Sequence, residues 1–147
     1  MIKVAESYDE REQLDELLWK VLWKPLGLPR DTRNAFALPG KEIELIAVED
    51  LRVVAGLVAN WTGKNDLEIR HLAVEEAYQR KFIGTRLLSG LFDLVKKRNP
   101  IRVQAYVRNT SCPFFVKCGF KQVTQQWLQH PDFEKHGIRF KPVEKYI

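Results

Sequence analysis

A short polar segment of this 147-residue chain carries the residues with the clearest chemistry. Gln79, Arg80 and Lys81 follow the apolar run 68–74 and precede a segment with helical periodicity. One face of that helix carries Ile83, Leu87, Leu91 and Leu94. The first N–H groups of a helix have no internal partner, and the helix dipole is positive there. Because Arg80, Lys81 and Arg86 add full positive charge, residues 79–84 are predicted to bind a phosphate or pyrophosphate.

The same segment resembles the acetyl-CoA motif of the GNAT N-acetyltransferase superfamily. That motif reads Arg/Gln-x-x-Gly-x-Gly/Ala and follows a strand that ends in an Ala-Val-like pair. Here Ala73-Val74 ends the strand, and Gln79 and Gly84 match the motif. Phe82 stands where the family usually has glycine, which takes positive φ freely. A helical residue has negative φ, so phenylalanine is acceptable at this position if residue 82 is already helical.

A second signature of the family lies downstream. The family has an asparagine, a short helix bearing Phe-Tyr, and then Lys-x-Gly-Phe at the start of a strand. Residues 109–120, Asn-Thr-Ser-Cys-Pro-Phe-Phe-Val-Lys-Cys-Gly-Phe, resemble this signature, with Phe115 in place of the tyrosine. Two motifs in the right order are far more specific than either one alone. A looser likeness over residues 23–29 indicates a bacterial and archaeal branch of the family.

The resemblance implies that acetyl-CoA binds as co-substrate. The backbone of Leu72, Ala73 and Val74 would pair with the pantetheine arm like an added strand, although these residues could also simply form a central strand. Asn109 would hydrogen-bond the same arm. The other implied cofactor-binding residues are Gln79, Arg80, Lys81, Phe82, Ile83, Gly84, Thr85 and Phe115. No metal is expected, because His130, His136 and the nearby carboxylates lack a recognisable ligand spacing.

The implied reaction is direct transfer of the acetyl group to a primary amine. The amine must be neutral to attack, so a base or a water chain must take its proton, and a donor must stabilise the thioester oxygen. The backbone N–H of Val74 is the expected donor, freed by a bulge. Glu68 is the candidate base, and a surface pair with Arg70 is an equally weighted alternative. Strand alternation places His71 on the face opposite Glu68, which favours a structural role for His71.

The residue at position 115 leaves the acid of the reaction open. The family tyrosine is positioned to protonate the leaving thiolate, whereas Phe115 has no proton to give. Tyr106, Ser111 and water are the candidate substitutes. The alternative function is an acyl-CoA-binding module with little or no turnover, which Phe82 and Phe115 favour. The acceptor amine cannot be read from the sequence, and a homodimer is an open option because dimers are common in the family.

The resemblance implies an α/β fold with a mixed, mostly antiparallel sheet of six to seven strands, flanked by about four helices and splayed at the central strands. We expect one domain over residues 1–147. Apolar patterning predicts strands at 2–4, 42–48, 51–61, 67–74, 101–107, 120–128 and 137–143. It predicts a helix that Asp9 or Ser7 can cap and that runs through about Trp23. It also predicts helices at 82–98 and 109–117, the first of these stopped by Asn99-Pro100. The short link Glu49-Asp50 predicts an antiparallel hairpin.

The composition places the chain among soluble globular proteins, with 45% hydrophobic and 29% charged residues. No apolar run has the length of a bilayer span, so no transmembrane helix is expected, and residues 1–6 lack the apolar h-region typical of a signal peptide. Cys112 and Cys118 are expected to be free thiols in a reducing cytoplasm. The net charge of +5 suits a ligand with several phosphates. The scattered Lys and Arg residues argue against a nucleic-acid partner.

Overall fold

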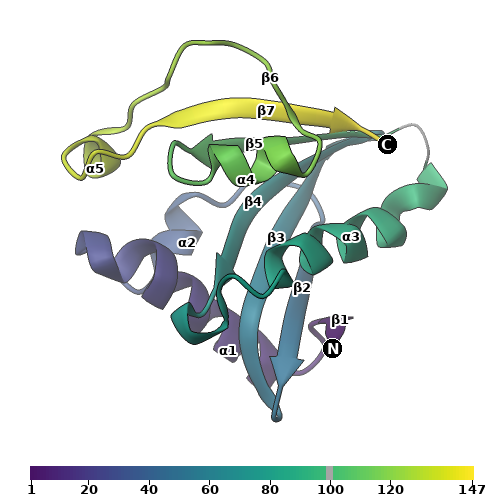
Figure 1. The fold of residues 1–147 in the computed structure, drawn as a ribbon. Helices are drawn as coiled ribbons and strands as arrows, with labels where there is room; N and C mark the ends of the chain where they lie inside the picture. The colour runs from purple at the N-terminus through teal and green to yellow at the C-terminus, as the bar shows by residue number, and fades with distance from the viewer. Residues whose placement is uncertain (99–100) are drawn as a thin grey trace.

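The computed structural model describes residues 1–98 and 101–147, which form a seven-stranded sheet with helices on both faces (Figure 1). The strands are β1 (Ile2–Val4), β2 (Glu42–Glu49), β3 (Arg52–Gly63), β4 (Asp66–Val74), β5 (Arg102–Arg108), β6 (Lys121–Gln122) and β7 (Phe140–Tyr146). Their order in the sheet is β1-β2-β3-β4-β5-β7-β6. β4 and β5 pair in parallel, and the other neighbours pair antiparallel. The predicted mixed, mostly antiparallel sheet is confirmed.

Five α-helices and four 3-10 or π-helical segments lie in the described part of the chain. The α-helices are α1 (Tyr8–Leu18), α2 (Thr32–Ala35), α3 (Ile83–Val95), α4 (Cys112–Lys117) and α5 (Pro131–Glu134). The π-helical segment is η1 (Trp19–Trp23), and the 3-10 segments are η2 (Lys24–Leu26), η3 (Glu76–Tyr78) and η4 (Lys96–Arg98). Over residues 1–98 and 101–147, none of the helices combines the length and apolar character that crossing a membrane requires.

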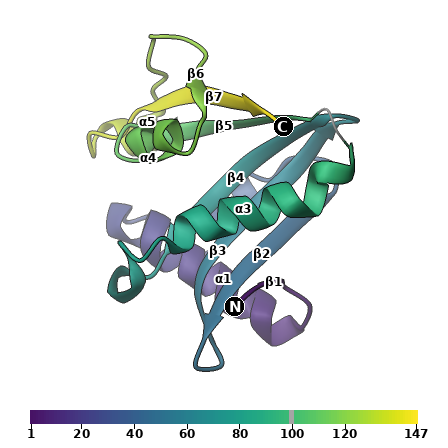
Figure 2. The ribbon, with the colours of Figure 1, turned by 45° about the vertical axis from the view of Figure 1, so that its right-hand side comes forward.

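Alternating side chains of β2 and β3 build two cores, one on each face of the sheet. Leu45 and Leu57 pack in the core that contains the buried face of α3. Ile46 and Val58 pack in the core that contains the buried face of α1. Figure 2 shows α3 in front of β2, β3 and β4, with α1 behind them. Because successive side chains of a strand point to opposite faces of the sheet, each face buries apolar side chains against a helix. The sheet is therefore the middle layer of the fold.

The hairpin between β2 and β3 is closed by a two-residue turn. Asp50 and Leu51 both have positive φ, 50° and 64°. Such a turn matches the twist of antiparallel strands, although it requires left-handed backbone at both positions. The predicted hairpin is confirmed.

The sheet opens between β4 and β5. The two strands pair only from Asp66 opposite Arg102 to Ile69 opposite Ala105. Beyond Ile69, β4 continues along β3 to Val74, while β5 continues along β7 to Arg108. Figures 1 and 2 show the two strands together at one end and diverging toward the other. The predicted splay is confirmed, and it leaves the far half of β4 without a strand on its β5 side.

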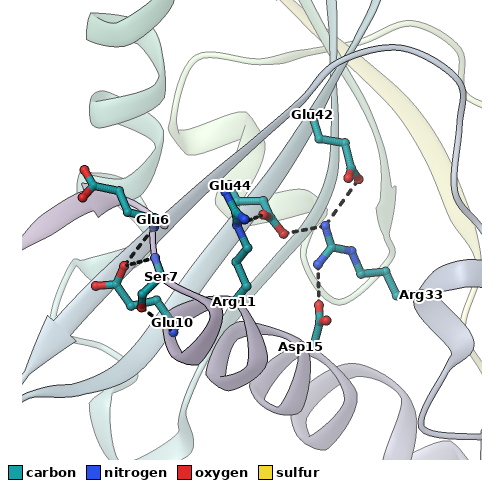
Figure 3. A network of polar contacts seen from close by, with 8 residues as sticks. All are labelled: Glu6, Ser7, Glu10, Arg11, Asp15, Arg33, Glu42 and Glu44. Atoms are coloured by element: carbon teal, nitrogen blue, oxygen red, sulfur yellow. Dashed lines mark hydrogen bonds and ion pairs between the residues drawn. The ribbon is translucent and has the colours of Figure 1, made fainter.

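Arg33 ties α2 to the outer part of the sheet and to α1 (Figure 3). Its guanidinium contacts Asp15 of α1, Glu44 of β2 at 2.8 Å and Glu42 of β2 at 3.3 Å. Burial of this group opposes its charged form, but the hydrogen bonds and charges of Glu44 and Asp15 outweigh burial and raise the pKa of Arg33. The network fixes the loop that ends at Phe36.

A capping box starts α1 next to this network. The Ser7 side chain accepts from the Glu10 N–H at 3.0 Å, and the Glu10 carboxylate accepts from the Ser7 N–H at 3.2 Å. This reciprocal pair satisfies two N–H groups that the helix cannot satisfy internally. The helix predicted to run through about Trp23 is α1 followed directly by η1, and Ser7 is its cap.

The C-terminal strands are shorter or shifted relative to the sequence prediction. The strand predicted over 120–128 is reduced to β6 and an isolated bridge of Leu128 with Phe140. Between them the Gln126 N–H bonds the Thr124 hydroxyl, a local contact that competes with a ladder. The last strand starts at Phe140 because Ile138 donates to Phe133 and closes α5 instead.

Two predicted helices also differ from the structure at their boundaries. The helix predicted over 109–117 begins at Cys112, because Ser111 still makes a turn with Arg108. The helix predicted over 82–98 is α3 and η4. Its predicted stop at Asn99-Pro100 lies outside the described residues.

Candidate active site

A cavity of about 460 Å³ lies where β4 and β5 separate. Its walls come from these two strands, from η1, from the residue after α2, and from α4 and α5. Glu68, Arg70 and His71 of β4 and Tyr106 and Arg108 of β5 supply polar groups to it. An apolar hollow with a few converging polar groups is the usual form of a small-molecule site.

A bulge in β4 determines which side chains reach the cavity. His71 lies opposite Val58 of β3, and Ile69 lies opposite Ala59, so Arg70 has no partner position. An extra residue shifts the alternation of a strand by one. Glu68 and His71 therefore share a face, and both line the cavity. The prediction that they lie on opposite faces was wrong, because it assumed an unbroken period of two.

Glu68 is buried, with 6% of its surface exposed, and is paired with Arg70. Arg70 Nη1 donates to Glu68 Oε2, and Arg70 Nη2 donates to the Phe36 carbonyl at 2.6 Å. Glu68 lines the cavity and pairs with Arg70, but the pair is not at the surface as the second alternative assumed. The Arg70 guanidinium therefore lies directly beside the Glu68 carboxylate in a buried position, and removing either side chain would leave the other without its partner.

His71 is held as a neutral imidazole at the wall of the cavity. Its ring meets the Trp23 ring edge-on, with the centroids 5.0 Å apart. Burial is the main cause that lowers the pKa of His71 to about 3, and the positive charges of Arg70, Arg33 and Arg108 lower it further. A neutral imidazole can accept a proton only weakly here, but it can orient a polar ligand by hydrogen bonding.

Phe115 takes the place of an acid in the second motif and is only 5% exposed. It packs edge-on against Phe114 and Phe120 and also lines the cavity. Tyr106 and Ser111 line the same cavity, so the structure brings both candidate acids to the hollow that Phe115 borders.

The loop after β4 and the first turn of α3 carry the positive charges of Arg80 and Lys81, and we call this segment the cradle (residues 79–85). Phe82 has φ 62° and ψ 17°, the left-handed conformation that glycine adopts without strain, and its side chain is 77% exposed. The expectation that residue 82 is already helical was wrong, because α3 begins at Ile83. Arg80 is left-handed too, with φ 63°. The phenylalanine therefore keeps the backbone geometry of the missing glycine.

Other cradle residues join this loop to its neighbours. Gln79 Nε2 donates to the Val74 carbonyl at 2.9 Å, which ties the cradle to the end of β4. A Cβ atom on Gly84 would lie 3.2 Å from the Phe114 ring of α4, so the first turn of α3 closely approaches α4. Arg80, Lys81, Thr85 and Arg86 are exposed around this turn.

The backbone of Val74 faces the side of β4 that lacks a strand. Glu75 donates its N–H to the Val54 carbonyl of β3 at 2.8 Å. Successive N–H groups of a strand point to opposite edges, so the Val74 N–H points away from β3. The Val74 carbonyl accepts from Gln79 rather than from β3, in agreement with this direction. The backbone N–H and C=O groups of Leu72 point to the same edge as those of Val74, and those of Ala73 point to β3.

Asn109 holds the segment that leads into β7. Its Nδ2 donates to the Gly137 carbonyl at 3.3 Å, and its Oδ1 accepts from the Arg139 N–H at 3.0 Å. An amide nitrogen has two hydrogens, so one remains for a ligand. Asn109 lies at the end of β5, across the splay from the cradle.

Sequence reasoning did not select Arg108, Phe36 or Phe133, which all border the cavity. Arg108 directly precedes the Asn109 of the second motif, and a charged residue at the end of a buried strand was an available signal. Phe36 and Phe133 lie in loop regions without periodicity and carried no comparable signal. In residues 1–98 and 101–147 no group of three or more His, Cys, Asp and Glu side chains could hold a metal ion.

The family model for the acetyltransferase (GNAT) domain matches residues 27–147. Solved structures agree with it over nearly the whole chain. An aminoglycoside 6′-N-acetyltransferase complexed with coenzyme A has a TM-score of 0.78 at 19% identity, over 99% of this chain and 96% of that one. The aminoglycoside 6′-N-acetyltransferase of Enterococcus faecium has a TM-score of 0.75 at 19% identity, with the same coverage of 99% and 96%. ElaA of Escherichia coli has a TM-score of 0.79 at 17% identity, over 99% and 100%. At these identities the likeness shows the fold.

Proposed function

Because the chain belongs to the GNAT acetyltransferase family, we propose that it transfers the acetyl group of acetyl-CoA directly to a primary amine held in the cavity. The observation that carries this proposal is the separation of β4 from β5 at the point where the cavity opens. The cavity lies where β4 separates from β5, the free edge of β4 borders that opening, and the cradle follows the end of β4. A long co-substrate can thus reach from the surface to a buried acceptor.

The cradle suits the pyrophosphate of the co-substrate. The N–H groups of Ile83, Gly84 and Thr85 lie in the first turn of α3, where no preceding carbonyl can accept them. Arg80, Lys81 and Arg86 surround that turn with positive charge. In this proposal Gln79 and Phe82 shape the loop rather than supply charge, since Gln79 is bonded to Val74 and Phe82 holds the left-handed bend.

The far half of β4 suits the pantetheine arm. The backbone groups of Leu72 and Val74 point to the edge without a strand, where an extended ligand can pair with them. We assign the Val74 N–H to the thioester oxygen, because that oxygen gains negative charge as the amine attacks. Asn109 can add a hydrogen bond from the opposite side through its remaining hydrogen. Phe115 contributes an apolar wall.

The amine nitrogen forms a bond to the acetyl carbon, the carbon–sulfur bond breaks, and the proton that the amine loses balances the proton that the thiolate gains. Glu68 is the proposed base. Arg70 contacts its Oε2, which leaves Oε1 for the amine or for a bridging water. Tyr106 or Ser111 is the proposed source of the proton for the thiolate.

One observation favours a second function, an acyl-CoA-binding module with little turnover. Phe115 is buried among other rings and has no proton to donate. Acetyl transfer to an amine remains our first proposal, because a thiolate is a good leaving group and two hydroxyl groups line the same cavity.

Calorimetric titration with acetyl-CoA tests where the co-substrate binds. Thr85→Glu places a negative charge in the first turn of α3, where it opposes pyrophosphate but favours the helix dipole. We expect wild type to bind and Thr85→Glu to bind at least about tenfold more weakly with an unchanged or higher Tm. Thr85→Gln is the matched neutral control and is expected to bind like wild type. Equal affinity in all three proteins would contradict the proposed cradle.

A further inference from the structure

Arg108 is a half-buried arginine of β5 that lines the cavity. Its Nη2 donates to the Leu22 carbonyl of η1 at 2.8 Å, and its guanidinium carbon lies 5.4 Å from the centre of the Phe133 ring. The side chain therefore spans from β5 to η1 and rests against α5. An arginine has five N–H donors, and one carbonyl satisfies only one of them.

No carboxylate lies within 4.0 Å of the Arg108 guanidinium in residues 1–98 and 101–147. Burial alone lowers the pKa of Arg108. Arginine nevertheless stays charged in proteins. A half-buried positive charge without a carboxylate beside it has lost part of its hydration, and an anionic ligand would offset that penalty.

The charges around the cavity also favour an anion. Glu68 is the one carboxylate among the described lining residues, and Arg70 already neutralises it. Arg108 then leaves the lining with an excess positive charge, while His71 is neutral. A polycationic acceptor would meet net repulsion here, because a partner of opposite charge is the one that such a field attracts.

The remaining walls are apolar and aromatic. Leu22, Trp23, Phe36, Phe133, Phe140 and Leu128 line the cavity. Phe133 packs edge-on against Phe140 at 5.1 Å and lies beside Phe36 at 6.0 Å. Such a lining suits an apolar side chain better than a sugar or a polyamine, whose many polar groups would lose their water.

We propose that the acceptor is an amino carboxylate with an apolar side chain, such as a hydrophobic α-amino acid, whose carboxylate pairs with Arg108 while its amine faces Glu68. This inference rests on the proposed acetyl transfer and specifies its substrate class. Arg108 and Glu68 line the same cavity from different strands, so one small zwitterion can contact both. Arg108 binds and positions the acceptor and takes no part in the proton transfers.

Binding of acids that lack the amine tests the anion site without any need for catalysis. The probes are 3-phenylpropionate and 4-methylpentanoate, each compared with its neutral primary amide by calorimetry on CoA-saturated protein. We expect at least one acid to bind at least about tenfold more tightly than its amide. In Arg108→Gln that preference should disappear, and Arg108→Lys should keep part of it.

Arg139→Gln is the matched control, because it removes an arginine that is exposed and lies outside the cavity lining. It should keep the full preference for the acid. Acids that bind no more tightly than their amides to wild type would overturn the inference, and so would a preference that survives in Arg108→Gln. If Arg108→Gln does not fold, a wild type without the preference still overturns the inference, and Arg108→Lys then tests the part played by Arg108.

A parallel assay of thiol release separates this inference from the proposed function. The substrates are phenylalanine, leucine and their primary amides, with spermidine and kanamycin as polycationic amines. Faster acetylation of the free amino acids than of their amides and the polycations supports both acetyl transfer and the proposed acceptor class. Acetylation that prefers the amides or the polycations overturns the acceptor class and leaves acetyl transfer standing. Preferential binding of the acids with no thiol release from any amine overturns acetyl transfer and leaves the anion site standing.

Discussion

Glu68 and His71 project from the same face of β4, because Arg70 between them has no partner in β3. The bulge brings a carboxylate and a neutral imidazole to one cavity, and it lets Arg70 reach both Glu68 and the Phe36 carbonyl. A strand with an unbroken period of two would bury one of the two side chains on the α1 face and the other on the α3 face. The position of the bulge therefore determines which groups an acceptor can meet.

Replacing Glu68 by Gln should slow acetyl transfer more than it weakens co-substrate binding. Glutamine keeps an oxygen for Arg70 but cannot take a proton, so we expect kcat to fall about 100-fold or more. Acetyl-CoA affinity should stay within about twofold, because Glu68 lies away from the cradle. Thiol release and calorimetry measure the two quantities. A kcat that is unchanged in Glu68→Gln would remove Glu68 from the role of base.

The low pKa of His71 predicts a defined pH dependence of stability. The folded value of about 3 lies below the ordinary value of 6.5, so the unfolded chain binds more protons between these pH values. Stability from this residue is fully present above about pH 6.5 and is lost as the pH falls toward 3. At pH 5 the loss should be about 2 kcal/mol.

Denaturant unfolding of wild type and His71→Gln at pH 8 and pH 5 measures this effect. The free energy of unfolding should fall between pH 8 and pH 5 by about 2 kcal/mol less in His71→Gln than in wild type. As an independent check, the Cε1–H resonance of His71 should not titrate between pH 5 and 8. A midpoint near 6.5 in that experiment would show that the ring is not held neutral.

Replacing Phe82 by Gly should stabilise the protein or leave it unchanged. The left-handed backbone at this position costs a non-glycine residue about 1 kcal/mol or more, and part of that gain is offset by the greater freedom of glycine in the unfolded chain. Phe82→Ala is the control, since it removes the ring but keeps the strain. We expect Tm to rank Phe82→Gly above Phe82→Ala, with acetyl-CoA binding retained in both. The reverse order would mean that the exposed ring, and not the backbone, determines stability here.

Replacing Arg33 by Met should destabilise the fold and weaken acceptor binding. Arg33 is the shared partner of Asp15, Glu42 and Glu44 (Figure 3), and its loss removes the hydrogen-bonded partner of the partly buried Asp15 and Glu44, at about 3 kcal/mol. Phe36, which lines the cavity, follows α2 directly, so KM for the acceptor should rise. Arg11→Met is the control, because Arg11 is 58% exposed and meets Glu44 at 3.6 Å. It should change stability by less than about 1 kcal/mol. Equal effects of the two changes would contradict a structural role for the Arg33 network.

The sequence predicted the sheet and the splay well because two motifs and clear alternation lie in its central strands. β3 and β4 alternate or run apolar, and the second motif follows β5 directly. The C-terminal region was less predictable. Thr124-Gln125-Gln126 is polar and makes a local contact, so its tendency toward a strand was overestimated. Ile138 is apolar but serves to close α5, a tertiary role that periodicity does not reveal.

The candidate site was predictable only in part for a similar reason. Glu68 and the cradle lie in a recognisable motif, whereas the cavity also needs Phe36, Arg108 and Phe133 from separate parts of the chain. Their meeting depends on the Arg33 network, on the end of β5 and on the short α5. A one-residue bulge at Arg70 leaves no signature in composition, although it reverses the side to which His71 points.

The most direct test of acetyl transfer is thiol release with product identification. Purified protein is incubated with acetyl-CoA and one amine at a time, and the free thiol and the mass of the amine are both measured. We predict one acetylated amine for each thiol released, at a rate well above that of acetyl-CoA and amine without protein. Tight binding of acetyl-CoA with thiol release at the protein-free rate for every amine would contradict catalysis and identify an acyl-CoA-binding module.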